Sequence, residues 1–109
     1  MLHKMNLRKI PFKQIENGVK NIELRLNDEK RKNLKIGDEI IFILENSEKK
    51  LTKKVKELIV KDKFSEIFLE KFRQKEAGFL ENDDVDEQME KYYSKQNIKK
   101  FGVVGIVLE

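Results

Sequence analysis

The chain contains several short runs with the two-residue period of a strand, separated by runs with helical spacing. Successive strand side chains point to opposite faces, so apolar residues at every second position predict a strand with one buried face. Residues 3–8 and 20–26 have this pattern. Residues 39–44 and 101–108 are apolar at both parities. That composition is typical of a strand buried on both faces.

Residues 51–61 fit two patterns, because their apolar positions have helical spacing while their residue types favour a strand. The β-branched pair Ile59 and Val60 is typical of strands, and a polar hairpin loop at residues 46–50 precedes the segment. We therefore expect a strand with a bulge.

A helix is expected between the first two strands. Pro11 suits the first helical position, where its missing N–H is not needed. Phe12, Ile15 and Val19 fall on one helical face. Gly18 is suited to end the helix in the left-handed conformation.

Three further helical segments are expected. Asn27 or Asp28 caps a single turn over residues 29–32. Ser65 caps a longer helix that ends at residue 77, with Phe64 and Leu69 placed as a hydrophobic staple. An aspartate at position 83 or 84 begins the last helix, whose apolar positions extend to residue 93.

The length and composition indicate one domain, residues 1–109. The chain has no cysteine, which excludes disulfides, thiolate catalysis and cysteine-based zinc sites. No apolar run approaches the roughly 20 residues that cross a bilayer, and the N-terminus lacks a signal-peptide core. We expect a cytoplasmic protein with no membrane partner, no metal and no cofactor.

The net charge of +4 is unevenly distributed. Six of the 20 acidic residues and none of the 24 basic ones lie between Glu81 and Glu90, so the rest of the chain carries +10. A basic body with one acidic patch suits a polyanion that approaches from one side. A lysine-rich solvated surface explains the same numbers.

The closest group of candidate functional residues consists of Lys20, Glu23 and Arg25. Glu23 and Arg25 share the strand face opposite the apolar residues. Lys20 follows a glycine turn, where the pleat need not yet hold, and can bend toward that face. A solvated ion pair is the plain interpretation, and such pairs contribute about 0–1 kcal/mol. In a cleft, two cations and one carboxylate would instead suit a phosphate or a polar nucleobase.

Other candidates surround this group. Asn27 and Lys30 are its neighbours along the chain. Tyr92 and Tyr93 are adjacent and point about 100° apart on a helix, so one packs in the core while the other is free to stack on a base. His3, the only histidine, is expected on the inner face of the first strand, held by a hydrogen bond.

Residues 18–25 carry the pattern G-x-K-x-x-E-x-R, which resembles the signature of the ASCH family, a branch of the PUA-like superfamily. The likeness covers nearly the whole chain. It implies an α+β fold, a small mixed β-barrel of about five strands with flanking helices, and a cleft near His3. Its other parts are His3–Leu7, Pro11–Phe12, Leu26–Arg31, Lys35–Asp38, Tyr92–Ser94 and Phe101–Ile106.

The resemblance implies a domain that binds RNA or a nucleoside. Some small ASCH proteins are amidohydrolases that act on N4-acetylcytidine, in which the motif lysine activates a threonine three residues later and a glutamate elsewhere assists. This chain keeps that lysine as Lys20 but has Glu23 at the threonine position, so the hydroxyl nucleophile is absent.

Two alternatives to simple binding remain. Glu23 could act as a general base for water, with Lys20 as its partner, in a hydrolase or a ribonuclease. The acidic helix could instead serve a protein-interaction adaptor. Lys20 and Glu23 are the catalytic candidates if the protein is an enzyme. The candidate ligand-binding residues are Lys20, Glu23, Arg25, Asn27, Lys30, Tyr93 and His3.

Overall fold

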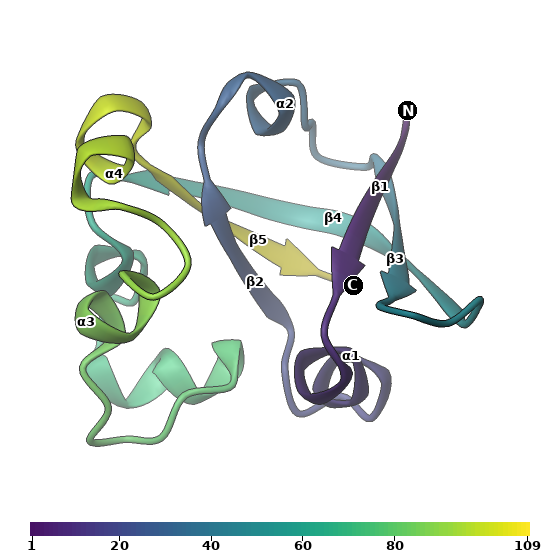
Figure 1. The fold of residues 1–109 in the computed structure, drawn as a ribbon, viewed down its shortest axis with the longest axis horizontal. Helices are drawn as coiled ribbons and strands as arrows, with labels where there is room; N and C mark the ends of the chain where they lie inside the picture. Colours follow the sequence, from purple (N-terminus) through teal and green to yellow (C-terminus); the bar gives the residue numbers. More distant parts are fainter.

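A five-stranded sheet forms the centre of the computed structural model, which describes all 109 residues (Figure 1). Its strands are β1 (Leu2–Leu7), β2 (Ile22–Leu26), β3 (Glu39–Leu44), β4 (Lys50–Lys61) and β5 (Val103–Leu108). They follow the order β1-β3-β4-β5-β2, with β1 parallel to β3 and the other pairs antiparallel. The sheet curls into a half-barrel, which confirms the predicted α+β class.

The half-barrel is open between β1 and β2, which are the two edge strands. Each of them pairs with a single neighbour. The Nη2 atom of Arg25 on β2 donates a hydrogen bond of 3.0 Å to the backbone oxygen of Asn6 on β1. One arginine side chain therefore links the two edges where a closed barrel would have a backbone ladder.

Apolar side chains pack on both faces of the sheet. Val104 and Ile106 of β5 belong to a core inside the half-barrel, together with Phe12 of α1 (Lys9–Glu16). Val103 belongs to a second core on the outer face, beneath the segments between β4 and β5. The two-sided burial predicted for the last strand is confirmed. For β3 it holds only in part, because its outward-pointing residues at 41 and 43 are half-buried.

The pairing of β2 with β5 decides where the charged face of β2 points. Leu24 belongs to the outer core, as do the two other apolar residues of this strand. Glu23 is in register with Ile106, and Arg25 with Val104, which belong to the inner core. Glu23 and Arg25 therefore point into the half-barrel, and the interpretation as a solvated pair is wrong.

Helix α1 lies at the end of the half-barrel where β1 ends and β2 begins (Figure 1). It starts two residues before Pro11, which still lies in the first turn, where backbone N–H groups lack helical partners. Gly18 has a φ of 84° and ends this region in the left-handed conformation, as predicted. Val19 follows that turn and is 58% exposed, so its predicted place on the helical face is wrong.

Strand β4 has a bulge between Val55 and Glu57, which confirms the interpretation of this segment as a strand. Opposite its second half, β5 contains Gly105. A Cβ atom at this position would lie 2.6 Å from Cγ2 of Ile67. The glycine therefore allows the outer layer to approach the sheet closely.

The helix predicted from Ser65 to residue 77 is replaced by two 3-10 helices, η1 (Phe64–Ile67) and η2 (Lys71–Ala77). The chain is extended at Phe68, which is buried in the outer core with the apolar residues of η1. Leu69 is 91% exposed, so the predicted staple is absent. Packing of these closely spaced side chains on the sheet overrides the helical propensity of the segment.

The remaining helices are short. α2 (Glu29–Lys32) begins at Asp28, whose side chain accepts from the N–H of Arg31, so the second of the two predicted caps is the one used. α3 (Val85–Met89) ends before the tyrosines, earlier than predicted. α4 (Lys95–Phe101) was not predicted, and it delays the start of the last strand to residue 103. None of these helices has the length and apolar character that a membrane crossing needs.

Candidate functional site

Lys20, Glu23 and Arg25 form a buried ionic triad, which is the most concentrated chemistry of the protein. The Glu23 residue is 4% exposed. Its Oε1 atom lies 2.8 Å from Nζ of Lys20, and its Oε2 atom accepts a hydrogen bond of 2.7 Å from Nε of Arg25. Both carboxylate oxygens are therefore engaged by cationic side chains.

The local backbone explains why Lys20 reaches this triad. After the left-handed turn at Gly18, the N–H of Lys20 donates to the backbone oxygen of Gln14 at 2.9 Å. This bond ties the start of β2 to the end of α1. It places Lys20 before the regular pleat begins, which confirms that its side chain bends toward the charged face.

The three charges of the triad do not cancel. Burial alone would raise the pKa of Glu23, but the charges of Lys20 and Arg25 and the hydrogen bonds from both outweigh burial, so that pKa is lowered. Glu23 is therefore ionised at neutral pH. With two cations around one carboxylate, the triad has a formal charge of +1.

A cleft of about 640 Å³ opens above the triad. Its wall includes Asn6 from β1 and the triad itself, so it lies at the open side of the half-barrel, between the two edge strands. This volume is in the usual range for small-molecule sites. The other lining residues include Arg8, Gln14, Gly78, Gln88, Tyr92 and Tyr93.

The two tyrosines have different surroundings. The ring of Tyr93 stacks on Phe64 with 6.0 Å between ring centroids, and burial raises the pKa of its hydroxyl. Tyr92 is 54% exposed, and the guanidinium carbon of Arg8 lies 4.9 Å from its ring centroid. Both line the cleft, but Tyr92 is the more exposed ring, with Arg8 over one of its faces, while Tyr93 is partly committed to packing.

Three predicted site residues are not brought to the cleft. His3 is hydrogen-bonded to Asp38, with 2.9 Å between Nε2 and Oδ2, which confirms that a hydrogen bond holds it. It lies at the opposite end of β1 from the residues that line the cleft, so the expected nearness is wrong. Asn27 uses its backbone N–H to bond Gly102, and Lys30 is exposed on α2.

Sequence reasoning missed Gln14, Gln88, Arg8 and Gly78. They come from α1, α3 and two loops, and they meet only because these segments converge on the open side of the half-barrel. No spacing in the sequence relates them.

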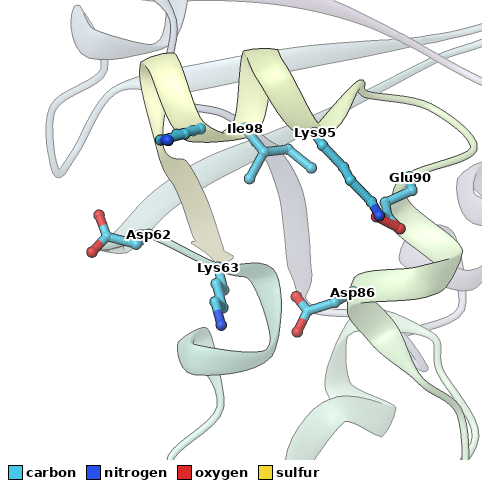
Figure 2. Close-up of a pocket in the computed structure, with 7 residues that line it drawn as sticks. Asp62, Lys63, Asp86, Glu90, Lys95 and Ile98 are labelled. Carbon is cyan, nitrogen blue, oxygen red and sulfur yellow. The ribbon is translucent and has the colours of Figure 1, made fainter.

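A second hollow, of about 590 Å³, lies between the end of β4, α3 and α4 (Figure 2). Its charges are balanced, with three lysines and three acids. Nζ of Lys95 is 3.5 Å from Oε1 of Glu90, and Asp86 accepts hydrogen bonds from Ser65. Lys95 and Glu90 therefore pair with each other, and Asp86 is held by Ser65. No group of three or more His, Asp or Glu side chains in the molecule is placed to hold a metal ion.

Comparison with known proteins identifies a matching family and similar solved structures. The ASCH domain family matches residues 5–109. The crystal structure of the hypothetical protein PH0355 is 35% identical, with a TM-score of 0.83, and the match covers 100% of this chain and 98% of that one. The solution structure of protein PF0455 from Pyrococcus furiosus is 30% identical, with a TM-score of 0.66 and coverage of 100% and 96%. No curated protein matches the sequence significantly. The chain belongs to the ASCH domain family.

Proposed function

We propose that the cleft binds an unpaired nucleotide of single-stranded RNA, or the corresponding nucleoside. The observation that carries this proposal is the buried triad of charge +1 at the base of a cleft whose rim holds the half-exposed ring of Tyr92. Cations that face an open cleft attract phosphate and base carbonyl oxygens, and an aromatic ring with a free face stacks on a base. Membership of a PUA-like family often linked to RNA binding supports the same class of partner.

The state of Glu23 favours binding over hydrolysis. An efficient general base has a pKa near the working pH and a free oxygen that can reach the proton it removes. The pKa of Glu23 is lowered, and each of its oxygens is engaged by a cation. In this proposal Glu23 is a positioning residue, which holds Lys20 and Arg25 with their remaining N–H groups available to a ligand.

The test measures fluorescence anisotropy of a labelled single-stranded RNA with wild type, Glu23→Gln and Tyr92→Ala. Glu23→Gln keeps the shape of the side chain but removes the charge that orders both cations, and should weaken binding by about 1–3 kcal/mol. Tyr92→Ala removes a stacking surface worth about 1–3 kcal/mol per base. Affinity for RNA should also fall as salt rises, because phosphate contacts release counterions.

Lys95→Ala is the matched control, because it removes a lysine from the second hollow and leaves the cleft intact. The proposal fails if Glu23→Gln and Tyr92→Ala bind RNA and nucleosides as tightly as wild type. It also fails if purified wild type converts N4-acetylcytidine to cytidine or cuts RNA, and Lys20→Ala abolishes that turnover.

A further inference from the structure

We propose that Gln14 reads the hydrogen-bonding edge of a base in the cleft, with Gln88, which lines the same cleft, as a second reader. This inference rests on the proposed function, and it adds that the cleft selects the base as well as holding it. Gln14 comes from α1 and Gln88 from α3, so the two carboxamides reach the cleft from different segments.

The third glutamine of this region shows what a structural carboxamide looks like here. Gln74 is 3% exposed, and its Nε2 atom donates to the backbone oxygens of Leu80 and Asp83. Those bonds hold the loop after η2. Gln14 and Gln88 have no comparable partner in the protein, and both are half-exposed in the cleft wall. Their donors and acceptors remain available to a ligand.

Gly78 leaves room for the Gln14 carboxamide at the cleft wall. A Cβ atom at residue 78 would lie 2.7 Å from Oε1 and 3.3 Å from Cδ of Gln14. The carboxamide therefore packs against the bare backbone of Gly78, in space that any side chain would occupy. A side chain at residue 78 would push the carboxamide away from this part of the cleft wall.

The two carboxamides add acceptors to a cleft whose cationic groups supply only donors. Lys20 and Arg25 supply only donors, and the carboxylate of Glu23 is engaged by both of them. A carboxamide supplies an acceptor and two donors in one plane, which is the pattern that pairs with adjacent donor and acceptor groups of a base edge. Because it is neutral, it adds nothing to the charge attraction for phosphate. The combined set fits a polar base edge better than a phosphate alone.

The experiment uses nucleosides, which lack phosphate, so that only recognition of the base and sugar is measured. Adenosine, cytidine, guanosine and uridine are titrated into wild type and followed by NMR chemical shifts. Wild type should discriminate among the four. Gln14→Met keeps the length of the side chain but removes its hydrogen bonds, and should reduce the affinity ratio between the best and the worst nucleoside by roughly 5- to 150-fold.

Gln96→Met is the matched control, since Gln96 is exposed on α4 and does not line the cleft. Gln14→Glu replaces the donors of the carboxamide with a second acceptor while preserving its shape, and should change which nucleoside binds best. A thermal melt of each variant verifies folding, and Gln14→Glu keeps the test valid if Gln14→Met unfolds.

Two results overturn the inference in distinguishable ways. If Gln14→Met weakens all four nucleosides equally and Gln14→Glu leaves their order unchanged, then Gln14 does not read the base, although the proposed function stands. If wild type binds neither nucleosides nor single-stranded RNA, then the proposed function fails and this inference fails with it.

Discussion

Two carboxylates in this molecule are each held by two basic groups, but their surroundings differ. Glu23 is 4% exposed and meets Lys20 and Arg25. Asp38 is 8% exposed and meets His3 and the amino group of Met1, which is 3.1 Å from Oδ1. Both carboxylates are buried and paired, but only Glu23 lines the cleft of about 640 Å³ described above.

Further hydrogen bonds of Asp38 go to the backbone around the turn before β3. Its Oδ2 atom accepts from the N–H of Lys35 at 3.0 Å, and its backbone oxygen accepts from Val55 of β4 at 2.8 Å. These bonds fix the turn that leads into β3. Glu23, by contrast, receives its side-chain bonds from cationic side chains. Glu23 therefore orders two cations that line the cleft, whereas Asp38 orders a turn of the fold.

The largest expected effect is on the buried cluster. Glu23→Leu leaves Lys20 and Arg25 without their anion inside the half-barrel, and breaking a buried pair from one side costs about 3–5 kcal/mol. Guanidinium denaturation should show that loss in the free energy of unfolding. Glu16→Leu, which breaks an exposed pair with Lys49, is the control and should change stability by about 0–1 kcal/mol. If Glu23→Leu is as stable as this control, then the buried Glu23 cluster stabilises the fold no more than an exposed ion pair does.

The next effect concerns the link across the open side. Arg25→Lys keeps the positive charge but cannot hold Glu23 and the backbone oxygen of Asn6 at the same time in the geometry of a guanidinium. We expect a loss of about 1–2 kcal/mol in the free energy of unfolding. Amide hydrogen exchange should also quicken along β1. Unchanged exchange in that strand would show that Arg25 does not join the edges.

A smaller loss in the free energy of unfolding is expected for Asp38→Asn, because one partner of Asp38, the Met1 amino group, lies in solvent. Hydrogen bonds from His3 and the Met1 amino group lower the pKa of Asp38 to about 2, from an ordinary value of 3.8. The ionised form therefore stabilises the folded state above pH 3.8, and that contribution is lost as the pH falls through 2.

The stability difference between wild type and Asp38→Asn should accordingly shrink on acidification. Urea denaturation at a series of pH values measures it. A difference that stays constant down to pH 2 would mean that the side-chain charge plays no part in the turn.

The smallest effect is expected in the second hollow. Lys95→Ala breaks a pair with Glu90 in which the lysine side chain is 85% exposed, so stability should change by about 0–1 kcal/mol. RNA affinity should stay at the wild-type value, because the cleft is untouched. A loss of affinity as large as that of Glu23→Gln would move the binding site to this hollow.

Much of the fold followed from local pattern. The period of two is a property of the strand itself, so the alternation around Glu23 and the apolar run of β5 identified their strands without knowledge of neighbours. The segment from residue 64 to 101 was misassigned in several places. Its 3-10 turns exist because Phe64 and Ile67 pack on a sheet built from distant residues, and local propensity is too weak to anticipate this.

For the candidate site too, local sequence predicted some features and tertiary contacts decided the others. Lys20, Glu23 and Arg25 are close in sequence, so a glycine turn and one strand were enough to predict their grouping. The resemblance implied a cleft near His3, but His3 lies at the other end of β1. The strand pattern indicated its inner face and could not show which end of the strand a cleft occupies.

Burial and direction of the triad depended on strand pairing. Only the register with β5, which sets Glu23 opposite Ile106, turns the charged face of β2 into the half-barrel. Glu23 is therefore only 4% exposed. Convergence of α1, α3 and the loop at Gly78 then brings Gln14 and Gln88 to the same cleft. The sequence determines which side chains alternate along a strand, whereas contacts between residues far apart in the chain determine what those side chains face, because they arise only when the sheet curls and its outer layer packs.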